Sequence, residues 1–324
     1  MRYKRLQGTD LKVSDICLGT VKYGVEMEEG QAGEQLNRFL SLGGNFIDTA
    51  HVYGDWAPGE RAKSEHIIGR WLKSTGRRGD VIISTKGCHP DMEKFSVSRV
   101  TPECIVKDLE ESLRAMQTDY VDLYFLHRDD VNIPVAELLG MLEEQRKRGK
   151  IRWYGCSNWT LSRLKEADEY AKERNIPGFV CNQLMWSLAA INREGVTDPT
   201  LVMMDGDIWQ YHRRTGKNVM AYTSVAQGYL SKRIRGEEIR PQLRAQYENE
   251  QNEQILKLLR EWGLPVSEIS LAYLMQQVFV TVPIVTFRTQ QQLQEGMRST
   301  QTNVPEELME ALNQIRGYGK KAQH

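Results

Sequence analysis

The sequence lacks the features that mark several large classes of protein. No run approaches the roughly 18 consecutive apolar residues that a membrane-spanning helix needs. The basic start, MRYKRLQGTDLKV, is not followed by the apolar stretch of a secretory signal. The 43 Lys and Arg residues are balanced by 43 Asp and Glu residues, so the basic surplus of a nucleic-acid-binding protein is missing as well. We therefore expect a cytoplasmic protein that binds neither membranes nor nucleic acid.

Cysteine is scarce, and its arrangement excludes a disulfide framework. The five cysteines are scattered and include no CxxC pair, and Cys17, Cys156 and Cys181 lie in apolar stretches typical of a protein core. A reducing compartment fits this usage. We also expect no metal site, because the six histidines offer only His51 near Asp48 as a ligand-like pair, and no second site completes it.

Eight short apolar runs recur along the chain, with amphipathic stretches between them. The runs lie at 16–19, 45–48, 81–85, 121–127, 151–157, 178–183, 218–223 and 280–285. The stretches between them have apolar residues at helical spacing, and one begins with Thr101 before Pro102, a typical helix start. Eight such strands favour an α/β protein of the (β/α)8 TIM barrel type, with residues 1–324 as a single domain. An open doubly wound sheet is disfavoured because no GxGxxG follows the first strand.

Two segments depart from the strand–helix alternation. The first residues alternate around Gly8–Thr9–Asp10, which predicts a short N-terminal β-hairpin under the barrel. Residues 224–250 are charged and show few apolar anchors, so we expect a long, mobile lid among the long loops at the C-terminal face.

Polar side chains stand where the predicted strands end. Asp48 ends the second strand, Lys86 the third and His127 the fourth, and Tyr53 follows on the loop after Asp48. Taken singly, each has an ordinary explanation: an Asp at a strand end often caps the next helix, and a Lys is usually exposed. Parallel strands bring their ends to one face of a barrel, however, so the four can share one pocket.

At this point the sequence resembles the aldo-keto reductase superfamily over nearly its whole length. The matching stretches, in their usual order, are LGTVKYG, NFIDTAHVYG, SEHIIG, STK, TDYVDLYFLH, GKIRWYGCSNW and NQLMWSL. The resemblance implies a catalytic tetrad of Asp48, Tyr53, Lys86 and His127. It also implies an NAD(P)H-dependent oxidoreductase that transfers hydride reversibly between a nicotinamide and a carbonyl, with Tyr53 as general acid/base.

The implied tetrad has a simple electrostatic logic. Free tyrosine titrates near pH 10 and is a poor acid–base catalyst at neutrality. An ammonium about 4 Å away is worth roughly 4 kcal/mol to the phenolate. Lys86 would therefore lower the pKa of Tyr53, although desolvation opposes part of this effect. Asp48 would orient Lys86 and offset the cost of burying it, while His127 would donate to the substrate oxygen.

The cofactor implied is NADP (NADPH), with NAD as the alternative. The residues expected to bind it are Gly19, Thr20, Asp48, Ser157, Asn158, Gln183, Tyr222, Ser224, Val225, Ala226, Gly228, Leu230, Lys232, Arg288, Gln292 and Glu295. Without the motif, Ser157 and Asn158 would be interpreted as a cap of the following helix. Two positions depart from the family: Val225 replaces a usual proline and Gly296 a common asparagine. One basic residue that often grips a 2′-phosphate is also missing, and Arg288 is the candidate substitute.

The substrate is expected to be a small-molecule carbonyl or alcohol, such as a sugar or an aromatic carbonyl. The candidate substrate-binding residues are Tyr23, Trp56, His127, Arg128 and Trp186, with Tyr229 at the rim. The alternative function is a cofactor-binding redox sensor or regulatory subunit with slow turnover. A barrel hydrolase is disfavoured because no second acid follows a neighbouring strand. Either a monomer or a homo-oligomer is compatible with the sequence.

Overall fold

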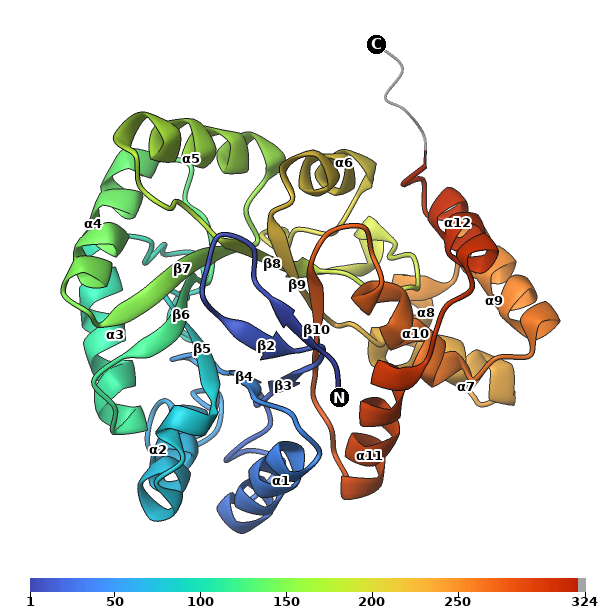
Figure 1. The fold of residues 1–324 in the computed structure, drawn as a ribbon, viewed down its shortest axis with the longest axis horizontal. Helices are drawn as coiled ribbons and strands as arrows, with labels where there is room; N and C mark the ends of the chain where they lie inside the picture. Colours follow the sequence, from blue (N-terminus) through green and yellow to red (C-terminus); the bar gives the residue numbers. More distant parts are fainter. Residues whose placement is uncertain (320–324) are drawn as a thin grey trace.

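The protein is a closed barrel of eight parallel strands surrounded by helices (Figure 1). The computed structural model describes residues 1–319. The strands follow one another around the barrel in chain order, and the last pairs with the first. This is the (β/α)8 TIM barrel that the eight apolar runs predict, and each predicted run overlaps one observed strand.

The barrel strands are β3 (Cys17–Gly19), β4 (Phe46–Asp48), β5 (Ile82–Gly87), β6 (Val121–Leu126), β7 (Ile151–Ser157), β8 (Cys181–Met185), β9 (Asn218–Tyr222) and β10 (Thr281–Val285). The helices of the described residues are α1 (Glu29–Ser41), α2 (Lys63–Thr75), α3 (Pro102–Met116), α4 (Val135–Lys147), α5 (Leu161–Arg174), α6 (Gly206–Thr215), α7 (Tyr229–Arg235), α8 (Pro241–Tyr247), α9 (Glu250–Trp262), α10 (Val266–Met275), α11 (Gln290–Arg298) and α12 (Glu306–Ile315). Four short 3₁₀ turns accompany them: η1 (Arg78–Asp80), η2 (Arg193–Gly195), η3 (Ala226–Gly228) and η4 (Ser299–Gln301).

Local sequence signals explain how these elements begin and end. The strands are buried on both faces, as in β6, because helices cover the barrel outside and side chains fill it inside. Helix α3 begins where predicted: the Thr101 side chain accepts from the backbone N–H of Cys104, and Pro102 occupies the first turn. It ends at Gln117, which takes a left-handed conformation.

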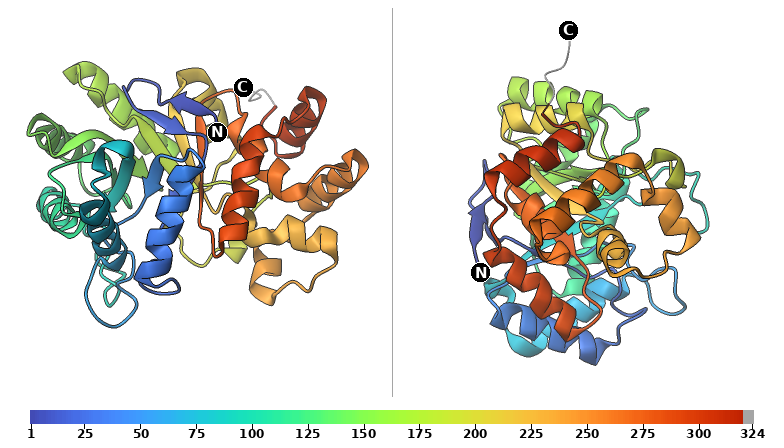
Figure 2. Two further views of the ribbon diagram at one scale, coloured as in Figure 1. Left: turned by 60° about the horizontal axis from the view of Figure 1, so that its bottom comes forward. Right: turned by 90° about the vertical axis from the view of Figure 1, so that its right-hand side faces the viewer.

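The predicted N-terminal hairpin is present and closes one end of the barrel. Strands β1 (Tyr3–Arg5) and β2 (Lys12–Ser14) pair antiparallel. Leu6, Leu11 and Val13 pack with the inward-facing residues Phe46 and Phe125 in one buried cluster. The left view of Figure 2 shows this dark blue hairpin at one end of the barrel and long loops at the other. The site described below lies at the loop end, where the strands finish.

The long segment between β9 and α9 differs from the expected lid. Residues 224–250 fold into η3, α7 and α8, and the side chains of Tyr229, Leu230, Ile239, Leu243 and Tyr247 are buried. The expectation of few apolar anchors was therefore wrong, because these anchors are spaced between charged residues and show no single run. Among the described residues, no helix has the length and apolar character needed to cross a membrane.

Candidate active site

Three neighbouring strands bring the predicted tetrad together. Asp48 is the last residue of β4 and pairs in register with Ser84 of β5, two residues before Lys86. His127 directly follows β6, and its backbone N–H donates to the carbonyl of Gly87 at 2.9 Å. Tyr53 lies on the loop after β4. The four residues that sequence reasoning selected therefore lie around one end of the barrel.

Lys86 is the centre of the arrangement. Its Nζ donates to Asp48 Oδ2 at 2.6 Å, to the carbonyl oxygen of Thr49 at 2.7 Å and to the Tyr53 hydroxyl oxygen at 3.1 Å. An ammonium has three donors, so all of them are satisfied. The side chain is fully buried. Burial lowers the pKa of Lys86, but the charge of Asp48 and the Tyr53 oxygen more than offset this and leave the pKa raised. Lys86 is therefore a fixed positive charge beside the phenol.

Asp48 is held as tightly as Lys86. One carboxylate oxygen bonds Lys86, and the other accepts from Ser84 Oγ at 2.8 Å and Gln183 Nε2 at 3.0 Å. A buried carboxylate is costly unless its oxygens are paired in this way. These three partners compensate the buried charge of Asp48 at the strand end. One of them, Gln183, comes from β8 across the barrel.

The pKa of Tyr53 is raised, which corrects the expectation of a net lowering. Desolvation at the barrel mouth raises the pKa, and the charge of Lys86 lowers it by less. Asp48 raises it further. Tyr53 is thus a neutral phenol at physiological pH. That is the protonation state a general acid requires before it donates.

His127 lies beside Tyr53 and is neutral. The ring centroids are 6.1 Å apart and the rings meet nearly edge to face. Burial, followed by the charge of Arg128, holds the pKa of His127 well below its usual range. Its Nδ1 is buried and bonds no other described residue. A neutral imidazole has one N–H donor and one acceptor, so His127 can donate a hydrogen bond without carrying charge.

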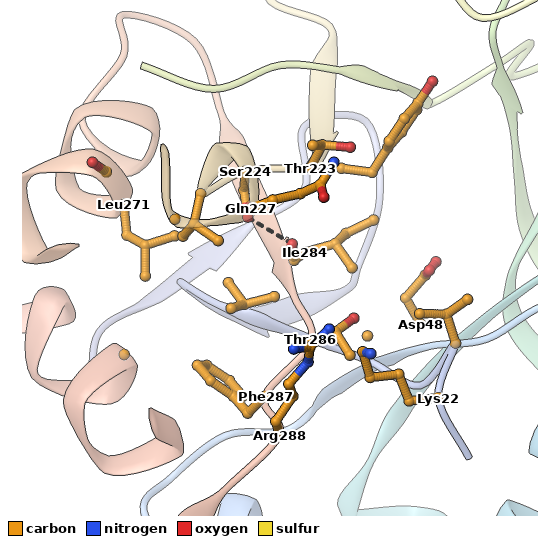
Figure 3. A pocket seen from close by; sticks show the side chains of 18 of the residues that line it. Lys22, Asp48, Thr223, Ser224, Gln227, Leu271, Ile284, Thr286, Phe287 and Arg288 are labelled. Carbon is orange, nitrogen blue, oxygen red and sulfur yellow. Dashed lines mark hydrogen bonds between the residues drawn. The ribbon is translucent and has the colours of Figure 1, made fainter. Parts of the chain in front are cut away.

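A cavity of about 720 Å³ runs from these catalytic candidates to the helix after β10 (Figure 3). Tyr53, His127 and Arg128 line its inner end. Its lining includes every residue predicted to bind the cofactor except Ala226. The methyl group of Ala226 is buried in the core instead. The cavity has the size of a small-molecule or cofactor site.

Ser157 and Asn158 face the cavity and do not cap the next helix. Thr160 is the residue at the N-cap of α5. Asn158 takes a left-handed backbone conformation with φ 61°. Its amide nitrogen donates to Ser157 Oγ at 3.1 Å, and its oxygen accepts from the Tyr222 hydroxyl at 2.6 Å. The alternative of a helix cap is thereby removed.

The segment after β9 is a series of tight turns. Thr223, Ala226, Gln227 and Gly228 all have φ between 48° and 79°. Two backbone N–H groups close these turns: that of Ala226 donates to the carbonyl of Thr223 and that of Gly228 to the carbonyl of Val225, both at 2.8 Å. Ser224 Oγ donates to the carbonyl of Ile284 at 2.7 Å, which ties this segment to β10 (Figure 3).

The far end of the cavity carries more positive charge than the sequence indicated. Arg288 lines it as predicted and is 66% exposed, with Nη2 3.9 Å from Glu26 Oε2. Lys22 lies beside Arg288 in Figure 3 and pairs with the same Glu26. Three further cations that line the cavity are Lys232, which was predicted, and Arg235 and Arg240, which were not. In this segment the prediction stopped at Lys232, because no local pattern marks Arg235 or Arg240 as facing the cavity.

The glycine at position 296 has a steric cause. A Cβ atom there would lie 2.4 Å from the ring of Phe287, which also lines the cavity. Such a distance requires the ring to move, so Phe287 and a side chain at 296 exclude each other. The departure from the common asparagine is therefore tied to the phenylalanine after β10.

Several predicted substrate residues lie elsewhere. Tyr23 is buried and donates to Gln35 Oε1 at 3.0 Å. Trp186 is buried against Phe279, with centroids 5.9 Å apart. The ring of Tyr229 is also buried. None of these three lines the cavity, so the structure gives no support to their prediction as substrate contacts.

Arg128 and His127, the other two residues predicted as substrate contacts besides Trp56, do line the cavity. Trp56 does not line the cavity; its ring lies 6.4 Å from that of Tyr53 between centroids and is 44% exposed.

His51 is not paired with Asp48, contrary to the sequence-based interpretation. Its Nε2 lies 2.9 Å from Glu111 Oε2 and its Nδ1 4.0 Å from Asp108 Oδ2, both on α3. These three residues form a group of potential metal ligands that sequence spacing did not reveal. Both oxygens of Asp108 already accept hydrogen bonds from the Arg99 guanidinium. The group therefore serves as a packed ion-pair network behind β5.

Comparison with known proteins agrees with this geometry. The model of the Aldo/keto reductase family matches residues 15–316. The uncharacterized oxidoreductase YrpG of Bacillus subtilis (strain 168) is 30% identical over 97% of this chain and 96% of its own length. Protein tas of Escherichia coli (strain K12) is 27% identical over 98% of this chain and 99% of its own. Norsolorinic acid reductase B of Dothistroma septosporum is 25% identical over 96% of this chain and 81% of its own length. The chain thus belongs to the Aldo/keto reductase family and is an oxidoreductase.

Proposed function

We propose that the protein reduces an aldehyde or ketone to an alcohol with NADPH, and that Tyr53 is its general acid. The observation that carries this proposal is the contact between Lys86 Nζ and the Tyr53 hydroxyl, 3.1 Å long, inside a buried network with Asp48. A structural tyrosine does not need a buried ammonium that is itself compensated by a buried carboxylate. Relatives whose names describe reductases support the same class of reaction.

Each group of the tetrad has a distinct role in this reaction. Tyr53 gives its proton to the carbonyl oxygen as negative charge develops there, and Lys86 stabilises the phenolate that remains. His127, being neutral, donates a hydrogen bond to the same oxygen and orients the carbonyl. Asp48 fixes Lys86 in reach of Tyr53. In the reverse direction, the phenolate accepts the proton of the alcohol.

The cavity fits a dinucleotide cofactor, which supplies the hydride when bound. Ser157, Asn158 and Gln183 would hold the carboxamide of the nicotinamide, and the ring of Tyr222 would pack against its face. The turns at 223–228, most of whose residues line the cavity, would lie against the pyrophosphate. The cations around Arg288 suit the adenosine end.

Cofactor binding and turnover test this function separately. Quenching of tryptophan fluorescence by NADPH would report binding, and oxidation of NADPH in the presence of a reactive aldehyde would report turnover. We expect both. Binding without turnover of any carbonyl compound would favour the redox-sensor alternative, and absence of binding would refute the proposal.

We further propose that the protein prefers NADPH to NADH through Arg288. A 2′-phosphate carries about two negative charges and favours a planar arginine. One charged hydrogen bond is worth roughly 1.5–3 kcal/mol, or about 10- to 150-fold in affinity. Arg288→Ala should therefore erase most of the difference between the dissociation constants of NADPH and NADH. Titration of both cofactors against wild type and variant measures this.

The neighbouring cations provide the matched control for Arg288. Lys22 shares Glu26 with Arg288, so Lys22→Ala removes the same charge from the same end of the cavity. We expect it to weaken both cofactors with a smaller change in their ratio, because an ammonium is a point charge without the bidentate fork. A wild type that binds NADH as tightly as NADPH, or an Arg288→Ala variant that keeps its preference, would contradict the assignment.

A further inference from the structure

The loop that carries Tyr53 is attached to β5 at His51. The backbone N–H of His51 donates to the carbonyl of Lys86 at 3.0 Å. A turn follows directly, in which the N–H of Tyr53 donates to the carbonyl of Ala50 at 2.9 Å. His51 is therefore bonded to the same residue, Lys86, whose ammonium contacts the Tyr53 hydroxyl. How far the phenol lies from Lys86 depends on how firmly the loop is held at His51.

The side chain of His51 extends to α3 on the outside of the barrel. It is buried, and its Nε2 lies 2.9 Å from Glu111 Oε2. A carboxylate only accepts hydrogen bonds, so Nε2 carries the proton and donates. Within residues 1–319, the carboxylate of Glu111 pairs with no side chain other than His51. This half-exposed acid on a surface helix thus contacts the protein interior only through His51.

The other acids near His51 are occupied elsewhere. Asp108 Oδ2 lies 4.0 Å from His51 Nδ1, which is too far for a hydrogen bond. Glu65 of α2 accepts from Thr85 Oγ1 at 2.5 Å, and burial raises the pKa of Glu65. Among the described side chains, the bond to Glu111 is therefore the one that fixes the imidazole of His51.

The same helix also holds the end of β5. The backbone N–H of Cys88 donates to Asp108 Oδ2 at 2.7 Å, and Cys88 takes a left-handed conformation with φ 63°. Asp108 lies one turn before Glu111 on α3, which packs against β5. Cys88 lies two residues after Lys86. One helix thus holds both the strand that carries the ammonium and the loop that carries the phenol.

We infer that Glu111 and His51 are positioning residues for the reaction, and that together they hold the loop of Tyr53 at the distance from Lys86 that proton transfer needs. The inference rests on the proposed function and adds two residues to it. Neither side chain lines the cavity, so both act through Tyr53. The effect can be large, because a misplacement of 1 Å can lower a rate by about 10²-fold.

Two adjacent glutamates on α3 provide a matched test. The side chains of Glu111 and Glu110 are 35% and 33% exposed, and Glu110 pairs with Lys150 instead of His51. Alanine favours a helix, so both alanine variants should fold. The probe is 4-nitrobenzaldehyde, whose nitro group makes the carbonyl reactive. With NADPH we expect Glu111→Ala to lower kcat by about 10-fold, less than a full 1 Å misplacement costs, with little change in KM. Glu110→Ala should keep the wild-type values.

Variants of His51 test the other half of the pair. His51→Leu should lower kcat by about 10- to 100-fold. His51→Gln should restore most of the loss, because its amide nitrogen can donate to Glu111 from nearly the position of Nε2. The double variant His51→Leu with Glu111→Ala should lose no more than His51→Leu alone, since the two residues act as one unit. A denaturant titration of each variant shows how much stability has changed.

The pH profile of alcohol oxidation reports the distance between Lys86 and Tyr53. Burial raises the pKa of Tyr53, and the charge of Lys86 lowers it. Asp48 raises this pKa and Arg128 lowers it to a smaller extent. Moving the phenol away from Lys86 weakens the effect of that charge, so the pKa of Tyr53 rises. Oxidation with NADP⁺ requires the phenolate, and its rising limb therefore moves to higher pH.

We expect this displacement in Glu111→Ala and His51→Leu, by less than in Lys86→Met, and none in Glu110→Ala. A Glu111→Ala variant that matches Glu110→Ala in kcat and in the oxidation limb would overturn the inference. A His51→Leu variant that loses activity without displacement of the limb, and without rescue by glutamine, would overturn it as well. Both results leave the proposed function intact. Failure of the wild type to oxidise NADPH with the aldehyde would count against the proposed function itself.

Discussion

Tyr53→Phe is expected to lower the rate constant of carbonyl reduction by about 10²–10⁴-fold, the usual contribution of general acid catalysis. The variant removes one oxygen and leaves the ring against Trp56 and His127. Lys86 keeps two of its three acceptors, Asp48 and the carbonyl of Thr49. The dissociation constant of NADPH should therefore stay close to that of the wild type. Single-turnover kinetics with saturating NADPH would measure the chemical step directly.

A second tyrosine provides the control for Tyr53→Phe. Tyr23→Phe deletes a hydroxyl that donates to Gln35 inside the core. It should cost about 0.5–1.5 kcal/mol of stability, the net value of one hydrogen bond, and it should leave most of the activity. A Tyr53→Phe variant with more than about a tenth of the wild-type rate would remove Tyr53 as the general acid. A large loss of activity in Tyr23→Phe would show that Tyr23 does more than fill the core, and the variant would then fail as a control.

The fold could be predicted from the sequence because its signals are local. A strand that is covered on both faces must be a continuous apolar run, and eight such runs with helices between them leave few topologies. Each run overlaps one observed strand, although β5 and β8 extend two residues beyond theirs. The same logic located the tetrad, since a polar residue that ends an apolar run must lie at the barrel mouth. Asp48, Lys86 and His127 were found in this way.

Side chains on the connecting loops could not be predicted in the same way. A loop has no period, so its sequence does not tell which way a ring turns. Trp186 directly follows β8 and turns to stack on Phe279, a partner distant in the chain. Its neighbours in sequence give no sign of this contact. Tyr23 turns into the core to meet Gln35 for the same reason.

The net effect of neighbouring charges and burial on the pKa of Tyr53 could not be predicted from the sequence either. The contact of Lys86 with Tyr53 followed from the resemblance, but the net pKa of Tyr53 depends on how much water surrounds the phenol. Desolvation is a property of the whole barrel mouth, and it outweighs the charge of Lys86. The segment 224–250 is a similar case, because its apolar anchors become recognisable only when they pack together. The pairing of Arg128 with Asp198 likewise joins two loops that no local pattern connects.

Lys86→Met is expected to shift the pH dependence of the reaction and to destabilise the fold. The charge of Lys86 lowers the pKa of Tyr53, so its removal raises that pKa further. Alcohol oxidation requires the phenolate, and its rising limb should therefore move to higher pH. The lost ammonium also leaves Asp48 buried without its partner, a change that typically costs about 3–5 kcal/mol. The pH profile of oxidation and a denaturant titration would measure the two effects.

A double variant separates the catalytic effect of Lys86 from its effect on stability. Asp48→Asn with Lys86→Met removes both buried charges, and replacing a buried ion pair by neutral groups is often close to neutral in stability. Ser84 and Gln183 can still bond an amide at position 48. Because Lys86 influences the pKa of Tyr53 more strongly than Asp48 does, the oxidation limb should remain displaced to higher pH while stability recovers. If the double variant instead regains both the stability and the pH profile of the wild type, Lys86 serves only to neutralise Asp48, and the phenol of Tyr53 works without help from its charge.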